Sequence, residues 1–226
     1  MICLVKFIIE TQVRLEAIPT PGAILYNAIV KKVLSKPELQ IAQEIVQKIK
    51  KGILIDVGSG TGFLSIEIAK RAPELEIYGI DLSRKMIEIA SGNARGFKNV
   101  KFKLVNAVNL PFDNNSIDFI VSTGSFHHWK HPLKIFNECY RVLKVNREAW
   151  IYDGCYNPPN DEIVRLKRKY GFFKYCFFSQ IQKLHGFKWE VYNTKIKRLL
   201  ERTKFKKNFQ MILADGWMKL VLGKSS

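Results

Sequence analysis

Cysteines are few in this sequence of 226 residues, and long apolar runs are missing from it. The four cysteines, Cys3, Cys139, Cys155 and Cys176, form no C-x-x-C pair, so their spacing suggests neither a zinc site nor a disulfide framework. No apolar run reaches the ~20 residues that span a bilayer. The apolar segment from Met1 to Ile9 lacks the cleavage pattern of a signal peptide. We therefore expect a cytoplasmic protein without a membrane span.

Acidic residues are scarce beside basic ones, with 20 Asp and Glu against 37 Lys and Arg and a formal net charge of +17. The excess is uneven, because 16 basic and 5 acidic residues follow Cys155 and give this part a charge of +11. Such a field attracts polyanions, so RNA or an acidic membrane surface is a candidate partner. A Lys-rich solvated surface is the alternative that we favour, since the charge run contains no binding motif.

Hydrophobic residues make up 47% of the chain, a content typical of a folded globular protein. The length suits a single α/β domain, and no internal repeat is visible. We expect an N-terminal helical extension over residues 1–50 and a core over 51–155. A lid insertion over 156–190 and a C-terminal helix and hairpin over 191–226 complete the expected organisation.

Strand-like and helical runs alternate along the core. A helix is expected between Pro37 and Lys51, ahead of the first strand. The expected strands are Ile53–Val57, Glu76–Ile80, Val100–Val105, Ser116–Ser122 and Ala149–Asp153, and the helices between them are Gly62–Arg71, Arg84–Ala94 and Pro132–Leu143. The alternation predicts βαβ units in a doubly wound parallel sheet with helices on both faces. Ligands of such sheets bind beyond the carboxyl ends of the strands.

The alternation stops after Cys155. Residues 156–190 are rich in Lys, Arg, Phe and Tyr, above all in Lys167–Tyr175, and are a candidate lid or substrate-recognition element. Basic and aromatic side chains together can hold single-stranded RNA or an acidic aromatic metabolite. A lid helix whose aromatic face packs on the sheet edge is the interpretation we favour. A helix over Thr194–Arg202 and an antiparallel hairpin of Phe209–Leu213 and Trp217–Leu222 are expected to follow.

A glycine-rich turn, Asp56-Val-Gly58-Ser59-Gly60-Thr-Gly62, follows the first strand. Its glycines allow backbone to approach a ligand, and the next helix presents free N–H groups there. The dinucleotide fingerprint G-x-G-x-x-G would need glycine at position 63, where this chain has Phe63. A carboxylate at Asp56 would repel a pyrophosphate but suits an ammonium group or ordered water. The turn therefore favours S-adenosylmethionine, which carries an ammonium, over a dinucleotide.

Asp81 ends the second strand, about 20 residues past the glycines, where a carboxylate can accept both hydroxyls of an adenosine ribose. Asp81 is not needed as a helix cap, because Ser83 precedes Arg84 and can cap the helix instead. Leu82 and Met86 offer apolar contacts to an adenine ring.

Three motifs in this order resemble the class I S-adenosylmethionine-dependent methyltransferases. They are Ile55–Gly62, Gly79–Ser83 with Met86, and Leu110–Asp113 before Ser116–Val121. Phe126-His-His-Trp129 followed by Asn137–Lys144 is similar to the subgroup that includes ubiquinone and menaquinone biosynthesis methyltransferases. The resemblance implies a Rossmann-like, seven-stranded sheet whose last strand is antiparallel. It also implies S-adenosyl-L-methionine as cofactor and S-adenosyl-L-homocysteine as product.

The resemblance also assigns cofactor-binding residues. It places Asp56, Gly58, Ser59 and Gly60 at the methionine part, Asp81 at the ribose, Asn106 and Ala107 at the adenine edge, and Thr123 near the sulfonium. Asn106 stands where the family usually has an acidic residue, but its carbonyl oxygen can accept a hydrogen bond from the adenine amine. Val145–Arg147 replaces a Pro-Gly-Gly type turn and is expected to lie outside the pocket.

Methyl transfer is an in-line displacement in which the protein mainly aligns the reactants, and a base is optional. His127 and His128 just past the fourth strand, and Asp153 at the end of the fifth, are candidate acid-base groups. The histidines can instead shape the loop beside Trp129. A metal site of His127, His128 and His131 is not expected, because the family chemistry needs no metal.

The expected acceptor is a small molecule methylated on oxygen, carbon or nitrogen. An RNA methyltransferase is the first alternative, but Asn157-Pro-Pro159 follows the fifth strand rather than the fourth and does not match the Asn-Pro-Pro-Tyr motif of nucleobase amino methylation. A non-catalytic protein that binds an adenosine ligand is the second. Nothing in the sequence predicts the oligomeric state.

Overall fold

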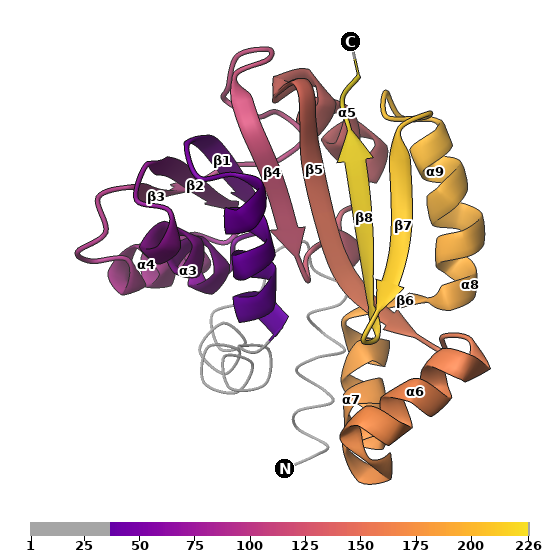
Figure 1. The fold of residues 1–226 in the computed structure, drawn as a ribbon. Helices are drawn as coiled ribbons and strands as arrows, with labels where there is room; N and C mark the ends of the chain where they lie inside the picture. The colour runs from indigo at the N-terminus through magenta and orange to yellow at the C-terminus, as the bar shows by residue number, and fades with distance from the viewer. Residues whose placement is uncertain (1–36, 226) are drawn as a thin grey trace.

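A central β-sheet organises the protein, whose computed structural model describes residues 37–225 (Figure 1). The expected N-terminal extension lies largely outside the described residues, which begin with a helix over residues 37–48. The strands are β1 (Gly52–Val57), β2 (Leu75–Asp81), β3 (Val100–Leu104), β4 (Ile117–Thr123), β5 (Leu143–Tyr156), β6 (Gly186–Lys188), β7 (Phe209–Ala214) and β8 (Trp217–Gly223). Their order in the sheet is β3-β2-β1-β4-β5-β8-β7, with β6 paired to β5.

The sheet is parallel from β3 through β5, and β8 runs antiparallel to both of its neighbours, β5 and β7. The predicted doubly wound sheet with an antiparallel last strand is therefore confirmed. The sheet has eight strands rather than the seven expected, because the insertion contributes β6. This strand has three residues and pairs with the end of β5 at Gly154–Tyr156.

Two hydrophobic clusters cover the two faces of the sheet, which is why its strands are apolar on successive residues. Leu54 packs in the cluster that contains the helix over 37–48 and α3 (Phe63–Arg71). The next residue, Ile55, packs in the cluster that contains α5 (Pro132–Val142) and α9 (Lys197–Glu201). Helix α4 (Arg84–Asn93) begins after Ser83, whose hydroxyl accepts from the amide of Met86 at 3.4 Å, as the sequence predicted.

The insertion forms two helices, α6 (Asn160–Tyr170) and α7 (Phe172–Leu184), at the end of the sheet toward which β4 and β5 point (Figure 1). The expectation that its aromatic face packs on the sheet is correct only in part. Phe178 of α7 does lie against the turn between β7 and β8, since a Cβ on Gly216 would come within 2.7 Å of its ring. Phe173 and Phe177, by contrast, are 86% and 65% exposed.

A continuous helical segment follows the insertion, made of α8 (Trp189–Val191), the π-helical turn Tyr192–Ile196 and α9. It begins earlier than the sequence predicted because Tyr192 is fully buried and donates its hydroxyl to the Gly154 carbonyl at 3.1 Å. Among the described residues, none of the helices has the length and apolar character needed to cross a membrane.

Candidate functional site

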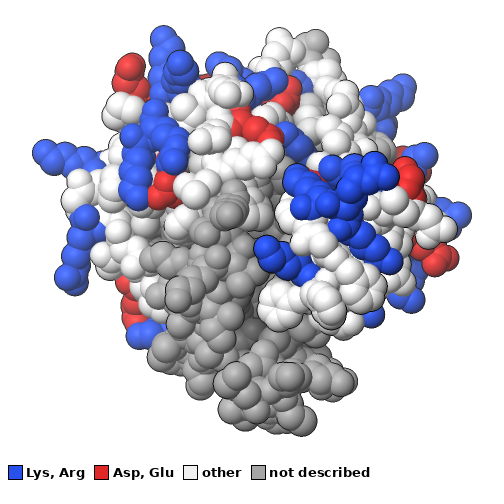
Figure 2. All heavy atoms as spheres, turned by 60° about the horizontal axis from the view of Figure 1, so that its bottom comes forward, with Lys and Arg blue, Asp and Glu red and all other residues white. Residues whose placement is uncertain are grey.

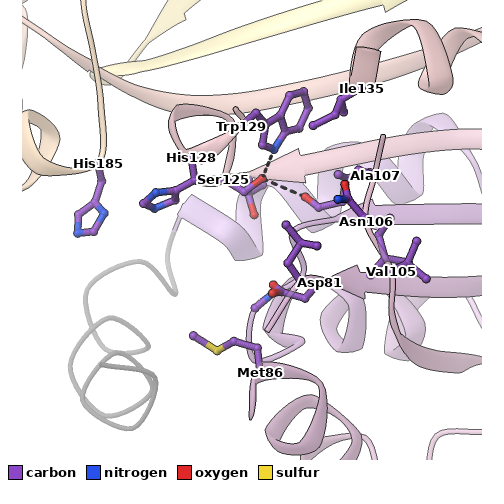
Figure 3. Close-up of a pocket in the computed structure, with 17 residues that line it drawn as sticks. Asp81, Met86, Val105, Asn106, Ala107, Ser125, His128, Trp129, Ile135 and His185 are labelled. Atoms are coloured by element: carbon purple, nitrogen blue, oxygen red, sulfur yellow. Dashed lines mark hydrogen bonds between the residues drawn. The ribbon is translucent and has the colours of Figure 1, made fainter. Parts of the chain in front are cut away.

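A cleft lies beyond the carboxyl ends of β1, β2 and β4 (Figure 3). The residues that line it come from the turns after these strands and from the segment after β3, which are distant in sequence. They are Val57, Gly58, Gly60, Ile80, Asp81, Leu82, Met86, Val105, Asn106, Ala107, Thr123, Gly124, Ser125, His128, Trp129, Ile135 and His185. The cleft therefore lies where a parallel sheet is expected to bind ligands.

Eight of the eleven residues predicted to bind a cofactor line this cleft. They are Gly58, Gly60, Asp81, Leu82, Met86, Asn106, Ala107 and Thr123. Ser125 and His185 line the cleft as well, although no ligand role was predicted for either of them from the sequence. Trp129, which also lines the cleft, belongs to the segment Phe126–Trp129 that resembles the menaquinone-type subgroup, whereas His185 lies in the insertion expected to form a lid and carries no sequence signal of its own.

The glycine turn forms one wall of the cleft through two residues in the left-handed region. Gly58 has a φ of 73°, and a Cβ on it would lie 2.5 Å from both side-chain atoms of Ser125. Gly60 has a φ of 52° and open space around the position of a Cβ. Its amide donates to Oδ2 of Asp81 at 3.0 Å, so the turn is fastened to the end of β2.

Asp81 carries the only carboxylate among the described residues that line the cleft. Burial raises its pKa, and hydrogen bonds from the amides of Ser83 and Gly60 oppose that shift. Because a carboxylate offers about four lone-pair sites, Asp81 retains acceptor capacity beyond these amides. Next to it, Oδ1 of Asn106 accepts from the amide of Val108 at 3.1 Å, which fixes the turn after β3.

Three residues of the turn that were predicted to bind the cofactor do not line the cleft, namely Asp56, Ser59 and Gly62. The carboxylate of Asp56 is 1% exposed and accepts from the hydroxyl of Ser65 at 2.6 Å. Its other oxygen and the Ser59 hydroxyl have no partner among the described residues. Asp56 could therefore interact with a ligand in the cleft only through an ordered water or after a movement of the turn.

Burial raises the pKa of Asp56 to about 7, while the Ser65 hydroxyl lowers it and the carboxylate of Asp81 raises it further. Burial also raises the pKa of Glu38 to about 8, with Asp56 as the second cause. The side chains around the glycine turn therefore include two carboxyl groups that a nearby cation would stabilise in their charged form.

The opposite wall is the loop after β4, in which Ser125 connects three elements. Its hydroxyl donates to the Val57 carbonyl at 3.1 Å and lies 2.7 Å from the Ser122 hydroxyl. It also accepts from Nε1 of Trp129 at 3.2 Å (Figure 3). Trp129 in turn stacks edge-on against Phe126, with ring centroids 5.2 Å apart. The loop is therefore a rigid wall whose side chains are fixed by contacts to β1 and β4.

Of the predicted acid-base groups, only His128 lines the cleft. His127 and Asp153 lie behind it, where Nδ1 of His127 is 2.9 Å from the Asp153 carboxylate. His128 is joined instead by His185, and Figure 3 shows their rings side by side at one end of the cleft. His131 is exposed and does not belong to this group.

The residues of the cleft fit an adenosine ligand bearing an ammonium group. Gly60 leaves the turn open to the cleft, Asp81 faces it with acceptor capacity to spare, and Asp56 has an unpaired carboxylate oxygen behind the turn. The replaced turn at Val145–Arg147 is at the far end of the sheet, where Asn146 donates to the Lys224 carbonyl. As predicted, it lies outside the cleft.

Comparisons with known proteins agree on one family. The family model described as "Methyltransferase domain" matches residues 48–216. A demethylmenaquinone methyltransferase of Thermotoga maritima is 35% identical over 52% of this chain and 49% of its own length. One of Lactobacillus johnsonii is 28% identical over 70% of both chains. The match thus spans about half to two thirds of these curated relatives.

A solved structure agrees with the fold. It is that of a protein of Methanococcus maripaludis described as an S-adenosyl-L-methionine-dependent methyltransferase, which is 26% identical to this chain. The two superpose with a TM-score of 0.72 over 91% of this chain and 93% of that one.

Proposed function

This chain belongs to the S-adenosylmethionine-dependent methyltransferases, and from this premise we propose that it methylates a small hydroquinone-like acceptor. The observation that carries the proposal is the cleft itself, in which the glycine turn, Asp81 and Asn106 form one half and apolar side chains form the other. Two relatives are named demethylmenaquinone methyltransferases, and this name supports the proposal because it indicates an oxygenated ring as the acceptor.

The acceptor side of the cleft is apolar and aromatic. Trp129 and Ile135 line it beside the two histidines (Figure 3). Although the chain has 37 Lys and Arg residues, none lies among the described residues that line the cleft. Such walls suit a flat neutral ring and offer no cation to hold a phosphate of RNA.

S-adenosylmethionine supplies an electrophilic methyl group when it is bound. In our proposal Asp81 accepts the ribose hydroxyls, Asn106 and Ala107 hold the adenine edge, and Gly58 and Gly60 let the backbone approach the methionine part. Trp129, held by Ser125, excludes water and orients the acceptor ring. Alignment of this kind is worth up to ~7 to 11 kcal/mol in a bimolecular reaction.

The histidine in the cleft is a poor general base. Burial, together with the nearby His127 and His185, lowers the pKa of His128 to about 3. Phenolic hydroxyls have pKa values near 10, so such an imidazole has little tendency to remove their proton. The ionisation of a hydroquinone acceptor must therefore be assisted by another feature of the site.

The test is methyl transfer from isotopically labelled S-adenosylmethionine to a short-chain 2-prenyl-1,4-naphthoquinol kept reduced under anaerobic conditions. We expect label in the organic phase. Asp81→Ala should weaken cofactor binding in calorimetry by roughly 10- to 150-fold, because it removes hydrogen bonds to a charged group. Asp161→Ala, which removes an exposed carboxylate on α6, is the matched control and should bind as the wild type does.

The outcomes separate the parts of the proposal. Cofactor binding without label in any quinol or phenol would refute the hydroquinone acceptor. Label in total RNA instead would support the RNA alternative, and binding without any transfer would support a non-catalytic adenosine-binding protein. Absence of binding would contradict methyl transfer itself.

A further inference from the structure

Three of the four histidines in the chain converge at one end of the cleft. His127 and His128 belong to the 3-10 turn Phe126–His128 after β4, whereas His185 directly precedes β6. One ring nitrogen from each of the three lies within 4.8 Å of those of the other two. Figure 3 shows the rings of His128 and His185 next to each other. Residues from two distant parts of the chain thus form one cluster.

The fold holds these residues together through backbone and aromatic contacts. The amide of Gly154 at the end of β5 donates to the His185 carbonyl at 3.2 Å. Phe187 of β6 packs against Phe126, with ring centroids 5.3 Å apart. The insertion is therefore fixed against the loop that carries His127 and His128. Backbone and core contacts, rather than contacts between the histidines themselves, hold the cluster together.

Asp153 fixes the orientation of His127. Both carboxylate oxygens of Asp153 lie close to Nδ1 of His127, at 2.9 and 3.1 Å, and its Oδ2 also accepts from the His127 amide at 2.6 Å. A carboxylate in this position keeps the proton on Nδ1 and leaves the lone pair on Nε2. That Nε2 is buried and finds no hydrogen-bond partner in the described part of the chain.

His128 shows the same feature, since its Nδ1 is buried without a hydrogen-bond partner among residues 37–225. The rings of the consecutive residues His127 and His128 lie with their centroids 3.9 Å apart and are tilted by 44°, a contact that satisfies neither nitrogen. Buried polar atoms are nearly always paired, so two unpaired nitrogens in one cluster point to a ligand.

We propose that His127, His128 and His185 bind a divalent transition-metal ion of the Zn²⁺ class, and that Asp153 is the positioning residue for His127. Neutral imidazoles are common ligands of such ions, and a carboxylate on the other ring nitrogen is their usual outer partner. Nitrogens around a tetrahedral ion with bonds of about 2.1 Å are about 3.4 Å apart. The separations in the cluster, all within 4.8 Å, would thus have to shorten by at most about 1.4 Å, which rotation of the His128 and His185 side chains can supply.

Three protein ligands leave one position of a tetrahedral ion open, as at catalytic zinc sites. Here that position would face the cleft, because His128 and His185 line it. An acceptor hydroxyl bound there would ionise more easily, with its proton passing to water. This role rests on the function proposed above, whereas metal binding itself does not.

The experiment is a titration of the metal-stripped full chain with Zn²⁺ in competition with a chromophoric chelator, repeated with Co²⁺ for its visible absorption. We expect one ion per chain and the intense spectrum of a four-coordinate site without thiolate. Asp153→Asn should weaken Zn²⁺ binding about 10- to 100-fold. His127→Ala and His185→Ala should weaken it further, and the exposed His131→Ala is the matched control that should not.

Circular dichroism and cofactor calorimetry on each variant establish that it is folded. If His127→Ala does not fold, the test uses His185→Gln in its place. This change keeps a side chain of similar length at the position just before β6. The proposal is overturned if no ion binds, or if binding is the same in wild type, His185→Gln and Asp153→Asn. Zn²⁺ binding without any methyl transfer would support the metal site but refute the proposed function. Full turnover by metal-stripped protein would refute only the catalytic role of the ion.

Discussion

Asp56 is the residue whose environment departs most from what its sequence motif suggests. The motif places a carboxylate in front of the glycines, but the fold buries it. The hydroxyl of Ser65 donates to it, and burial raises its pKa to about 7. Near pH 8 the folded protein must therefore keep a buried charge that the unfolded chain exposes to water. Carboxyl groups with raised pKa values are common at ligand-binding sites, where binding of a ligand can be the reason that a protein keeps a buried charge.

Asp56→Asn should stabilise the protein above neutral pH. A carboxyl whose folded pKa is raised binds its proton more tightly when folded, so its contribution to stability is lost as pH rises from about 4 to about 7. Asparagine has no such loss and can still accept from Ser65. Urea unfolding near pH 8 should show a free energy of unfolding higher by roughly 1 to 4 kcal/mol, and near pH 5 the difference should shrink. A variant less stable than wild type near pH 8 would contradict the assignment.

Gly58 and Gly60 allow a matched comparison within one turn. Alanine at either position must adopt a positive φ, at a cost of about 1–2 kcal/mol. At Gly58 the new Cβ also collides with Ser125, whereas at Gly60 it enters open space. We expect Gly58→Ala to lower the melting temperature more, and Gly60→Ala to remain folded but to lose affinity for S-adenosylmethionine in calorimetry. Equal melting temperatures would mean that Ser125 does not constrain the turn.

At the scale of elements, the strands of the core were predictable because their patterns are local. β1, with its run of apolar residues before glycines, was predicted to within one residue. β6 was not predicted, because three residues, Gly-Phe-Lys, carry no pattern of their own. They form a strand only because Gly154 and Phe126 lie beside them in the folded chain.

The same contrast explains which parts of the site were predictable. Gly58, Asp81 and Asn106 each directly follow or end a strand, and the ends of parallel strands meet at one edge of the sheet. His185 is separated from His128 by α5, β5, α6 and α7, so only the tertiary structure reveals that the two are neighbours. His131, which is close in sequence, lies outside the cluster, and the third histidine comes from the insertion instead.

The insertion meets β5 at a point where a side chain has no room. A Cβ on Gly154 would overlap Oε1 of Gln182 in α7 and the backbone carbonyl of His185. Gly154→Ala should therefore push α7 and β6 away from β5 and cost about 1–3 kcal/mol of stability. Gly92→Ala is the control, since Gly92 lies in α4 with open space around it and should leave stability unchanged or raise it by about 0.4–1 kcal/mol. Thermal unfolding of both variants makes the comparison, and a stable Gly154→Ala would mean that the insertion is not tightly packed.

At the scale of the whole molecule, the net charge of +17 is a property of the surface rather than of the site. Figure 2, which looks onto the lower end of the molecule in Figure 1, shows far more Lys and Arg than Asp and Glu on this face. Several of the cations are neutralised locally, as where Arg165 and Lys169 of α6 both pair with Asp215 at 2.8 and 2.7 Å. The remaining field attracts polyanions in general and selects no particular acceptor.

We therefore expect RNA to bind without being methylated. Filter binding with total RNA should show retention at low salt that falls steeply as salt rises, because each phosphate contact releases a counterion and steepens the slope by roughly 0.7 for a single strand. Labelled methyl groups should remain absent from the RNA, since no Lys or Arg lines the cleft among the described residues. A double variant, Lys167→Glu with Arg168→Glu, should reduce retention while leaving turnover of the small acceptor unchanged. Retention that persists at high salt, together with label in the RNA, would show that the charged surface and the cleft act on one polymeric substrate.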